Sequence, residues 1–366
     1  MRTERPPVTL LVSVVLTVLL IFISVVPERP FLSPWTDSNP FETARRGVDT
    51  GVVLAGSFNI VHPASNPLEA LQQEVADGIH PPGSIALEAY NQGSVLVDVS
   101  PDYQIQYYTR SLESGGSLVY FVVWLGDRAH IEVVNADDAI PGSDDTGDTI
   151  WLDGQQHLAT VEEMANAPYA WREHMTLMAA MAFGFHGSVR TSNEGTVVIN
   201  HVIHRVNPGR AALCIGPQGT AAIGLFDEAA LHSCEQAIGA GPVILWRGKI
   251  ANPHVSQETE EFIPFNPLGE DFVQIDWRRK VYMGTYPKSV VGIGTRPDGG
   301  FYLIMAVSYG VPGLELARQM QAMGCIDVLG GDDDTSTQAV WRGMPVRDHR
   351  LRPVPDALSV YWRETP

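Results

Sequence analysis

The chain has 366 residues, a formal net charge of −18 and a pI of about 4.9. This length suggests one large domain or two smaller ones, with ample room for a hydrophobic core. The acidic balance disfavours nucleic acid and anionic lipid as general partners, so an anionic substrate needs a local basic patch. The three cysteines, Cys214, Cys234 and Cys325, fit no zinc or CxxC pattern. A bond between Cys214 and Cys234 requires an oxidising compartment, and we expect three buried free thiols instead.

The N-terminus carries the clearest single feature. Residues 8–26 form a run of 19 residues without a charge, preceded by Arg2 and Arg5. At about 1.5 Å per residue a helix of this length spans a bilayer core, and positive flanks stay cytoplasmic. We therefore expect an uncleaved transmembrane signal anchor, with residues 1–7 in the cytoplasm and the remaining chain extracytoplasmic. A cleaved signal peptide is the alternative, but no small-x-small site follows the run.

Between this segment and the first strands, the sequence predicts a linker and a helix. Residues 27–50 are rich in Pro, Ser, Asn and Asp, which is typical of a stalk. Residues 66–79 start with a potential N-cap, Asn66, followed by Pro67, and predict a short helix. From residue 94 the pattern changes to strands, which we expect at 94–100, 103–109, 117–125 and 128–134. Residues 137–148 read as an exposed acidic loop without the ligand spacing of a calcium loop.

The second half of the chain alternates many short strands with few helices. A helical segment is expected at 160–170, and the turn "RPDGG" within 289–308 predicts a hairpin, because Asp-Gly supplies the positive φ angles that hairpins need. The best helix is 310–324, where Leu316, Ala317, Met320 and Met323 form an apolar stripe that Gly324 can close. Further strands are expected at 176–187, 195–206, 210–216, 220–226 and 241–248. The chain is therefore expected to be α+β, with mixed, largely antiparallel sheets, a few flanking helices and one N-terminal transmembrane helix.

After that helix comes the segment "GCIDVLGGDDDTST", in which an apolar strand passes through two glycines into three aspartates. This order resembles the signature LGAxDALNLDGGGST of the phosphodiester glycosidase domain family. Gly324 matches its first Gly, Asp327 its first Asp, Asp332 the Asp of DGGGS, and Ser336 the Ser. This is the family of the uncovering enzyme, which removes N-acetylglucosamine from a phosphodiester on lysosomal glycoproteins, and its bacterial relatives are linked to exopolysaccharide and envelope glycans.

Four other blocks resemble the family in the expected order, and together they place the domain at 117–345. Residues 51–116 are then an N-terminal extension of it and 346–366 a C-terminal tail. The chain departs from the family pattern at three places: Ala182 replaces an Asn, Lys288 replaces the Arg of the hairpin, and Asp333 and Asp334 replace two glycines. The blocks are "YPKSVVGIGTRPDGGFYLIMAV", "GPVILWRGKI", "PGRAALCIGPQGTAAIG" and "MAFGFHG".

The resemblance implies that Asp332 and Ser336 belong to the catalytic group, and Asp334, which replaces a family glycine, is expected to join them. Carboxylates can serve as acid, base or nucleophile in cleavage of a sugar–phosphate bond. Side chains alternate along an extended segment, so Asp332 and Asp334 could share one side, where they would form either a site for a divalent cation such as calcium or a proton-sharing pair. The alternative is a solvated polar turn at the end of a strand.

Two basic residues are expected to bind the substrate phosphate, Lys288 and Arg210. Residues 276–296 carry five basic side chains against Asp276, a local charge of +4 that contrasts with the acidic chain. In the block "MAFGFHG", His186 could exchange protons near neutral pH, and Gly184 matches a family glycine. A solvated strand face is the alternative for the basic group, and a merely hydrogen-bonded side chain the alternative for His186.

Two functions therefore remain open. In the first, the chain is a membrane-anchored hydrolase that cleaves a sugar 1-phosphodiester in an envelope glycan, a teichoic-acid-like polymer or a glycolipid. Alternatively, it is a catalytically degenerate protein of the same fold that binds glycans or assists envelope or exopolysaccharide assembly. Retention of Asp332 and Ser336 favours the enzyme, and the replaced Asn and glycines favour the binding protein.

Overall fold

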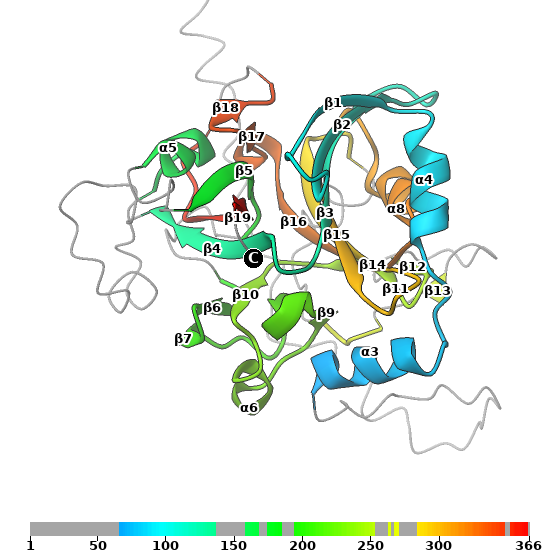
Figure 1. Ribbon diagram of the computed structural model, residues 1–366, viewed down its shortest axis with the longest axis vertical. Helices are drawn as coiled ribbons and strands as arrows, with labels where there is room; N and C mark the ends of the chain where they lie inside the picture. The colour runs from blue at the N-terminus through cyan, green and yellow to red at the C-terminus, as the bar shows by residue number, and fades with distance from the viewer. Residues whose placement is uncertain are drawn as a thin grey trace, which may run out of the picture. The chain divides into compact units, whose positions relative to one another are not determined.

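The computed structural model describes residues 66–136, 158–167, 174–184, 194–252, 263–264, 267–270, 284–347 and 352–364. All of them belong to one compact unit, Val61–Pro366. They form three sheets with a few helices, which confirms the expected α+β class of largely antiparallel sheets (Figure 1). The predicted anchor, stalk and acidic loop lie outside the described residues. Within the described ranges, no helix has the length and apolar character needed to cross a membrane.

The largest sheet has nine strands in the order β1-β2-β3-β15-β14-β16-β11-β12-β13. Every neighbouring pair in it is antiparallel except β12 and β13. Its strands are β1 Val95–Val99, β2 Ile105–Ser111, β3 Ser117–Trp124, β11 Val243–Trp246, β12 Lys249–Asn252, β13 Ile263–Pro264, β14 Lys288–Thr295, β15 Phe301–Tyr309 and β16 Cys325–Asp333.

The hairpin of β14 and β15 forms as the sequence predicts. Its strands pair in unbroken register from Lys288 opposite Ser308 to Thr295 opposite Phe301. The turn is closed by the backbone N–H of Arg296, which donates to the carbonyl of Gly300 over 2.8 Å. Gly299 takes a φ of +81°, which L side chains rarely adopt.

The predicted helix after this hairpin is α8, Gly313–Ala322, and it buries its whole apolar stripe of Leu316, Ala317, Met320 and Met323. Gly324 ends it with a φ of +76°, and a Cβ there would lie 2.2 Å from the carbonyl oxygen of Gly83. This close approach seats α4, Ser84–Asn91, next to α8. The sequence analysis missed α4, because its N-cap, Gly83, has no capping side chain.

Two five-stranded sheets complete the fold. The second sheet has the order β7-β6-β10-β8-β9 and the third β18-β17-β5-β19-β4. Residues 195–206, expected as one strand, form a hairpin instead, because Asn200 and His201 both take positive φ angles. The strands are β6 Val197–Ile199, β7 Val202–Arg205, β8 Ala212–Ile215, β9 Ala221–Gly224 and β10 Gln236–Gly239, and β4 Ala129–Asn135, β5 Met175–Ala182, β17 Ala339–Trp341, β18 Met344–Pro345 and β19 Asp356–Arg363.

The expected C-terminal tail, residues 346–366, is instead part of the domain. Its strand β19 lies between β5 and β4 in the third sheet and pairs with both. Ala357, Leu358, Val360 and Tyr361 of this strand are fully buried. The sequence therefore continues the core to residue 363, and the boundary placed at 345 is wrong.

The core forms on both faces of the nine-stranded sheet. In β3, Tyr120 and Val122 join a cluster with the buried residues of α4 and α8, whereas Phe121 and Val123 join one with the two smaller sheets. This division follows from the alternation of side chains along a strand. A third cluster packs α5, Val161–Asn166, on the third sheet. Two further helices are α3, Pro67–Ala76, as predicted, and α6, Glu228–Leu231.

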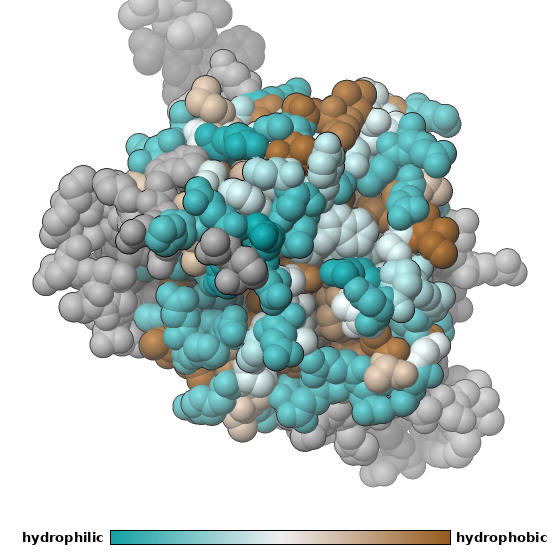
Figure 2. All heavy atoms as spheres, viewed as in Figure 1, coloured by the Kyte–Doolittle hydropathy of each residue, from teal (hydrophilic) through white to brown (hydrophobic). Residues whose placement is uncertain are grey.

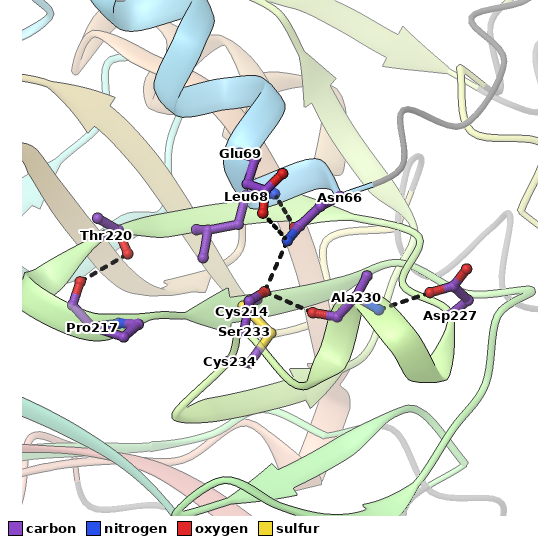
Figure 3. Close-up of a disulfide and its surroundings, with 10 residues drawn as sticks. All are labelled: Asn66, Leu68, Glu69, Cys214, Pro217, Thr220, Asp227, Ala230, Ser233 and Cys234. Carbon is purple, nitrogen blue, oxygen red and sulfur yellow. Dashed lines mark hydrogen bonds between the residues drawn. A yellow bond between two sulfur atoms is a disulfide. The ribbon is translucent and has the colours of Figure 1, made fainter.

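The expectation of three free thiols is wrong, because Cys214 and Cys234 form a disulfide and Cys325 alone is free (Figure 3). The bond joins β8 to the residue two before β10. Next to it, Asn66 Nδ2 donates to the hydroxyl of Ser233 over 3.2 Å, and this contact connects the start of α3 to the second sheet (Figure 3). Sequence spacing alone could not reveal the pairing, which depends on the approach of two non-neighbouring segments.

A buried ion network links α3 to β16. Asp327 is fully buried and its carboxylate accepts from the backbone N–H of Arg247 over 2.7 Å and forms an ion pair with the guanidinium of Arg247. Arg247 Nε also contacts Glu74 at 2.9 Å, and Glu74 contacts His80 at 2.8 Å. Burial raises the pKa of Asp327, and the charge of Arg247 opposes this shift.

One edge of the nine-stranded sheet exposes apolar residues. Val95, Leu96 and Val97 of β1 are 65%, 48% and 49% exposed. In Figure 2, brown apolar residues gather over this strand at the top of the view.

Candidate active site at the ends of β5, β16 and β19

Two glycines bring β16 close to the end of β5 and to the Gly241–Pro242 corner. A Cβ at Gly331 would lie 2.6 Å from the ring of Phe183, and one at Gly330 would lie 3.1 Å from the carbonyl oxygen of Pro242. The backbone of Gly330 exchanges two hydrogen bonds with this corner, donating to Pro242 over 2.9 Å and accepting from Gly241 over 2.8 Å. The pair "GG" in the signature segment is therefore required for close backbone contact.

Asp332 follows these glycines and is held firmly at the end of the strand. It is 5% exposed, and its backbone N–H donates to the carbonyl of Phe183 over 3.1 Å. Its own carbonyl accepts from the hydroxyls of Ser289 and Thr337. Its carboxylate oxygen Oδ1 accepts the backbone N–H of Asp333 over 2.9 Å. The backbone of Asp332 is thus held on a rigid support at the end of β16.

The expected alternation of Asp332 and Asp334 along an extended segment does not occur. The strand ends at Asp333, and Asp334 begins a 3₁₀ turn over Asp334–Ser336 with a φ of +60°. That φ favours glycine, which is the residue of the family signature at this position. Ser336 is buried at the end of the turn. No group of three or more His, Cys, Asp or Glu that could hold a metal occurs in the described part of the chain, so a cation at Asp332 and Asp334 gains no third such ligand there.

Lys288 does not offer its ammonium to a phosphate, contrary to the prediction from sequence. The residue is 3% exposed, and Nζ donates to the backbone carbonyls of Gly284, Tyr286 and Val311 over 2.6, 2.7 and 3.0 Å. These bonds use all three of its protons. Burial lowers the pKa of Lys288 to about 8, while the nearby charge of Asp333 acts in the opposite direction.

The +4 patch is likewise not one surface. Lys288 begins β14 and Arg296 directly follows its last residue, so eight residues of extended chain place them about 26 Å apart. Arg296 forms an exposed ion pair with Asp298 at the hairpin turn. The other three basic residues of the patch, Arg278, Arg279 and Lys280, lie outside the described residues.

Arg210 lies near the buried carboxyl group of Glu270, which the sequence analysis missed. The guanidinium of Arg210 itself is 3.5 Å from a different acid, Glu194. Glu270 is 5% exposed, and its two carboxylate oxygens accept the backbone N–H groups of Ala211 and Val243 over 3.0 and 2.9 Å. Burial raises the pKa of Glu270 to about 7, against the effects of the two hydrogen bonds and of Arg210. Glu270 thereby links the Arg210 segment to the Gly241–Pro242 corner; no local signal in the sequence marks it.

A second carboxylate meets the end of β5 from the third sheet. Asp356 is 1% exposed, and its Oδ1 accepts the backbone N–H of Gly184 over 2.9 Å. Gly184 directly follows Phe183, which accepts from the backbone of Asp332. Asp332 and Asp356 therefore contact consecutive residues from two different sheets. Sequence analysis missed Asp356 because it fell in the supposed tail; the apolar alternation of 356–363 was the available signal. His186 lies outside the described residues.

This arrangement provides two anchored carboxylates, a guanidinium and a closely packed glycine-rich backbone. Such a set can supply acid and base groups at a glycosidic carbon. A guanidinium such as that of Arg210 can bind a phosphate through two parallel hydrogen bonds. No step assigned to these residues involves a metal ion.

Comparisons with known proteins agree with the motifs. The sequence model of the family described as phosphodiester glycosidase matches residues 176–361, just over half of the chain. This range begins at residue 176, later than the predicted start at 117. It ends at 361, later than the predicted 345, because it reaches into β19. No curated protein matches the sequence.

Two solved structures match the chain at low sequence identity, and the first of them shows a similar fold. A crystal structure of a hypothetical protein from Synechocystis is 14% identical, with a TM-score of 0.52, over 71% of this chain and 62% of that one. The match thus spans less than two thirds of that protein. The zebrafish N-acetylglucosamine-1-phosphodiester alpha-N-acetylglucosaminidase catalytic domain, auto-inhibited by its pro-peptide, is 14% identical with a TM-score of 0.49, over 76% of this chain and 93% of that chain.

Proposed function

Because this chain belongs to the phosphodiester glycosidase family, we propose that it hydrolyses a sugar 1-phosphodiester in an envelope glycan, a teichoic-acid-like polymer or a glycolipid. The observation that carries the proposal is Asp332, which stands at the Asp of the family signature and is fixed by backbone bonds at the end of β16. A carboxylate that is rigidly oriented beside a cleavable bond needs little reorganisation in the transition state.

Asp332 acts in this proposal at the anomeric carbon, as acid, base or nucleophile. Asp356 positions the end of β5 through Gly184. Arg210 is the residue to which we assign phosphate binding; its guanidinium pairs with Glu194, and Glu270 holds the backbone of the next residue, Ala211. Ser336 closes the turn behind Asp332.

The place of action that we propose is outside the cytoplasm, at a membrane. The uncharged run of residues 8–26 behind Arg2 and Arg5 supports an anchor of this orientation. The disulfide between Cys214 and Cys234 supports the same compartment independently, because such bonds persist where the surroundings are oxidising. Protease added to intact spheroplasts is expected to digest the domain; full protection would contradict this location.

A non-catalytic glycan-binding role is the second candidate, and two observations favour it. The ammonium of Lys288 is bound by three carbonyls, and Ala182, at the position of the family Asn, is buried and has no polar side chain. Both changes remove groups that could contact a substrate.

Hydrolysis separates the two functions. The full chain is incubated with a panel of sugar 1-phosphodiesters, and the released reducing sugar is measured. The enzyme hypothesis predicts turnover by the wild-type chain and none by Asp332→Asn. Glycan binding by the wild-type chain without turnover of any compound would establish the second candidate instead.

A further inference from the structure

A pocket of about 230 Å³ lies at the opposite end of the third sheet from the candidate active site. It is formed by the β3–β4 turn, the β8–β9 turn, the residue before β10 and the end of β19. Asp356 begins β19 at the candidate active site, and Arg363 ends it at the pocket. Seven strand residues separate them by about 23 Å, so the pocket and the candidate active site are distinct.

The disulfide fixes one wall of this pocket. Cys214 and Cys234 directly precede Ile215 and Glu235, which both line it. The backbone N–H of Glu235 donates to the carbonyl of Ile215 over 2.8 Å, so a covalent bond and a hydrogen bond hold the wall together. Figure 3 shows the disulfide beside the turn that carries Pro217. A pocket with such a wall is largely preformed, which reduces the entropy lost on binding.

A glycine closes the opposite side. Gly219 of the β8–β9 turn takes a φ of +73°, and a Cβ there would lie 2.9 Å from the backbone nitrogen of Gly126 in the β3–β4 turn. The two turns can touch only because residue 219 has no side chain. Both sides of the pocket are therefore fixed by the fold.

The lining combines hydrogen-bonding groups of both kinds with an apolar floor. Arg363 Nη2 lies 2.9 Å from His130 Nδ1. Since a guanidinium only donates, Nδ1 accepts, and the proton of the neutral imidazole is on Nε2. Apolar contact comes from Leu125, Ile131 and Ile215, and the polar side chains are Asp127, His130, Gln218, Glu235 and Arg363.

The charges of this lining disfavour an anion. Asp127 and Glu235 against Arg363 leave a formal charge of −1 with His130 neutral. A ligand that matches mixed donors and acceptors over an apolar floor is a polyhydroxylated ring. The volume equals that of about eight water molecules at about 30 Å³ each, which suits one sugar ring rather than an oligosaccharide.

We propose that this pocket binds one neutral sugar unit of a glycan, remote from the site of hydrolysis. A second contact to the same polymer raises the effective concentration of its cleavable bond at Asp332. This increase in effective concentration at Asp332 rests on the proposed function. The sugar site itself does not depend on that function.

The test is titration calorimetry of the full chain with the methyl glycosides of glucose, galactose, mannose and N-acetylglucosamine. At least one is expected to bind. Glu235→Ala and Asp127→Ala are each expected to weaken it about tenfold or more, the scale of a lost hydrogen bond to a charged group. Glu228→Ala, an exposed acid on α6 that does not line the pocket, is the matched control and is expected to bind like the wild type.

Asp332→Asn separates this site from the candidate active site, since it is expected to bind the sugar with unchanged affinity. Loss of binding in Asp332→Asn would place the sugar at the active site and overturn the proposal. So would equal affinity in all pocket variants with retained thermal melting, or the absence of binding by all four glycosides.

Discussion

The backbone N–H of Gly184 donates to the carboxylate of Asp356 over 2.9 Å and thereby joins β19 to the second residue after the end of β5. The preceding residue, Phe183, accepts from the backbone of Asp332. The position of Asp332 therefore depends on two sheets, and a change in Asp356 should reach it through the backbone.

Asp356→Asn tests this dependence. We expect the free energy of unfolding to fall by about 1.5–3 kcal/mol, the scale of a hydrogen bond to a charged group. The rate of hydrolysis should fall as well, mainly in kcat, because the variant displaces the support of the reacting carboxylate. Urea unfolding and steady-state kinetics measure the two effects. A stable variant with wild-type kcat would show that Asp356 does not position the site.

Lys288→Met should destabilise the fold rather than weaken phosphodiester binding. It leaves three backbone carbonyls, of which that of Val311 is buried, without their donor, and we expect a loss of about 1–3 kcal/mol in urea unfolding. Lys249→Met, an exposed lysine at the start of β12, is the control and should have little effect. Unchanged stability together with weaker phosphodiester binding would instead support the role predicted from sequence.

The buried ion network and the exposed hairpin pair form a matched comparison. Asp327→Asn removes a charge partner from the buried Arg247 pair and should cost about 3–5 kcal/mol. Asp298→Asn removes the partner of Arg296 where the aspartate side chain is 58% exposed, and should cost at most about 1 kcal/mol. Urea unfolding of both variants gives the difference. Equal costs would mean that the network does not stabilise the contact of α3 with β16.

Glu270 predicts a pH dependence of stability. Its pKa rises on folding from an ordinary 4.5 to about 7, so the folded state holds the proton more tightly than the unfolded state. Its contribution is therefore complete below about pH 4.5 and is lost as the pH rises through about 7, a change of up to about 3 kcal/mol. The difference in unfolding free energy between the wild type and Glu270→Gln should decrease over this range. A difference that is independent of pH would contradict the shift.

The number of reactive thiols tests the disulfide directly. Denatured, unreduced protein should expose one reactive thiol, that of Cys325, and three after reduction. Closing a loop with a sequence separation of 20 residues is worth about 3 kcal/mol, which Cys214→Ser with Cys234→Ser should remove. Three thiols before reduction would show that the bond is absent.

Local signals predicted much of this fold, and contacts between distant segments were beyond them. The Asp-Gly turn of the hairpin, the apolar stripe of α8 and the helix end at Gly324 each depend on a few adjacent residues, and all three are confirmed. Asp332 was found because strand, glycines and carboxylate are contiguous. The burial of Lys288, the acceptors of Glu270 and the pairing of β19 depend instead on residues far apart in the chain. From the sequence alone, Lys288 is read as an exposed cation, Glu270 as an ordinary acid and the segment of β19 as a tail.

The most direct test of the central claim compares kcat/KM for a sugar 1-phosphodiester in Asp332→Asn and Asp333→Asn. The two variants remove one negative charge each from adjacent residues of β16, but only Asp332 is buried against Phe183. We expect Asp332→Asn to lose at least about a hundredfold, the scale of a missing acid–base group, and Asp333→Asn to lose little. Wild-type kcat/KM in a folded Asp332→Asn variant would contradict the assignment of Asp332 as the catalytic carboxylate.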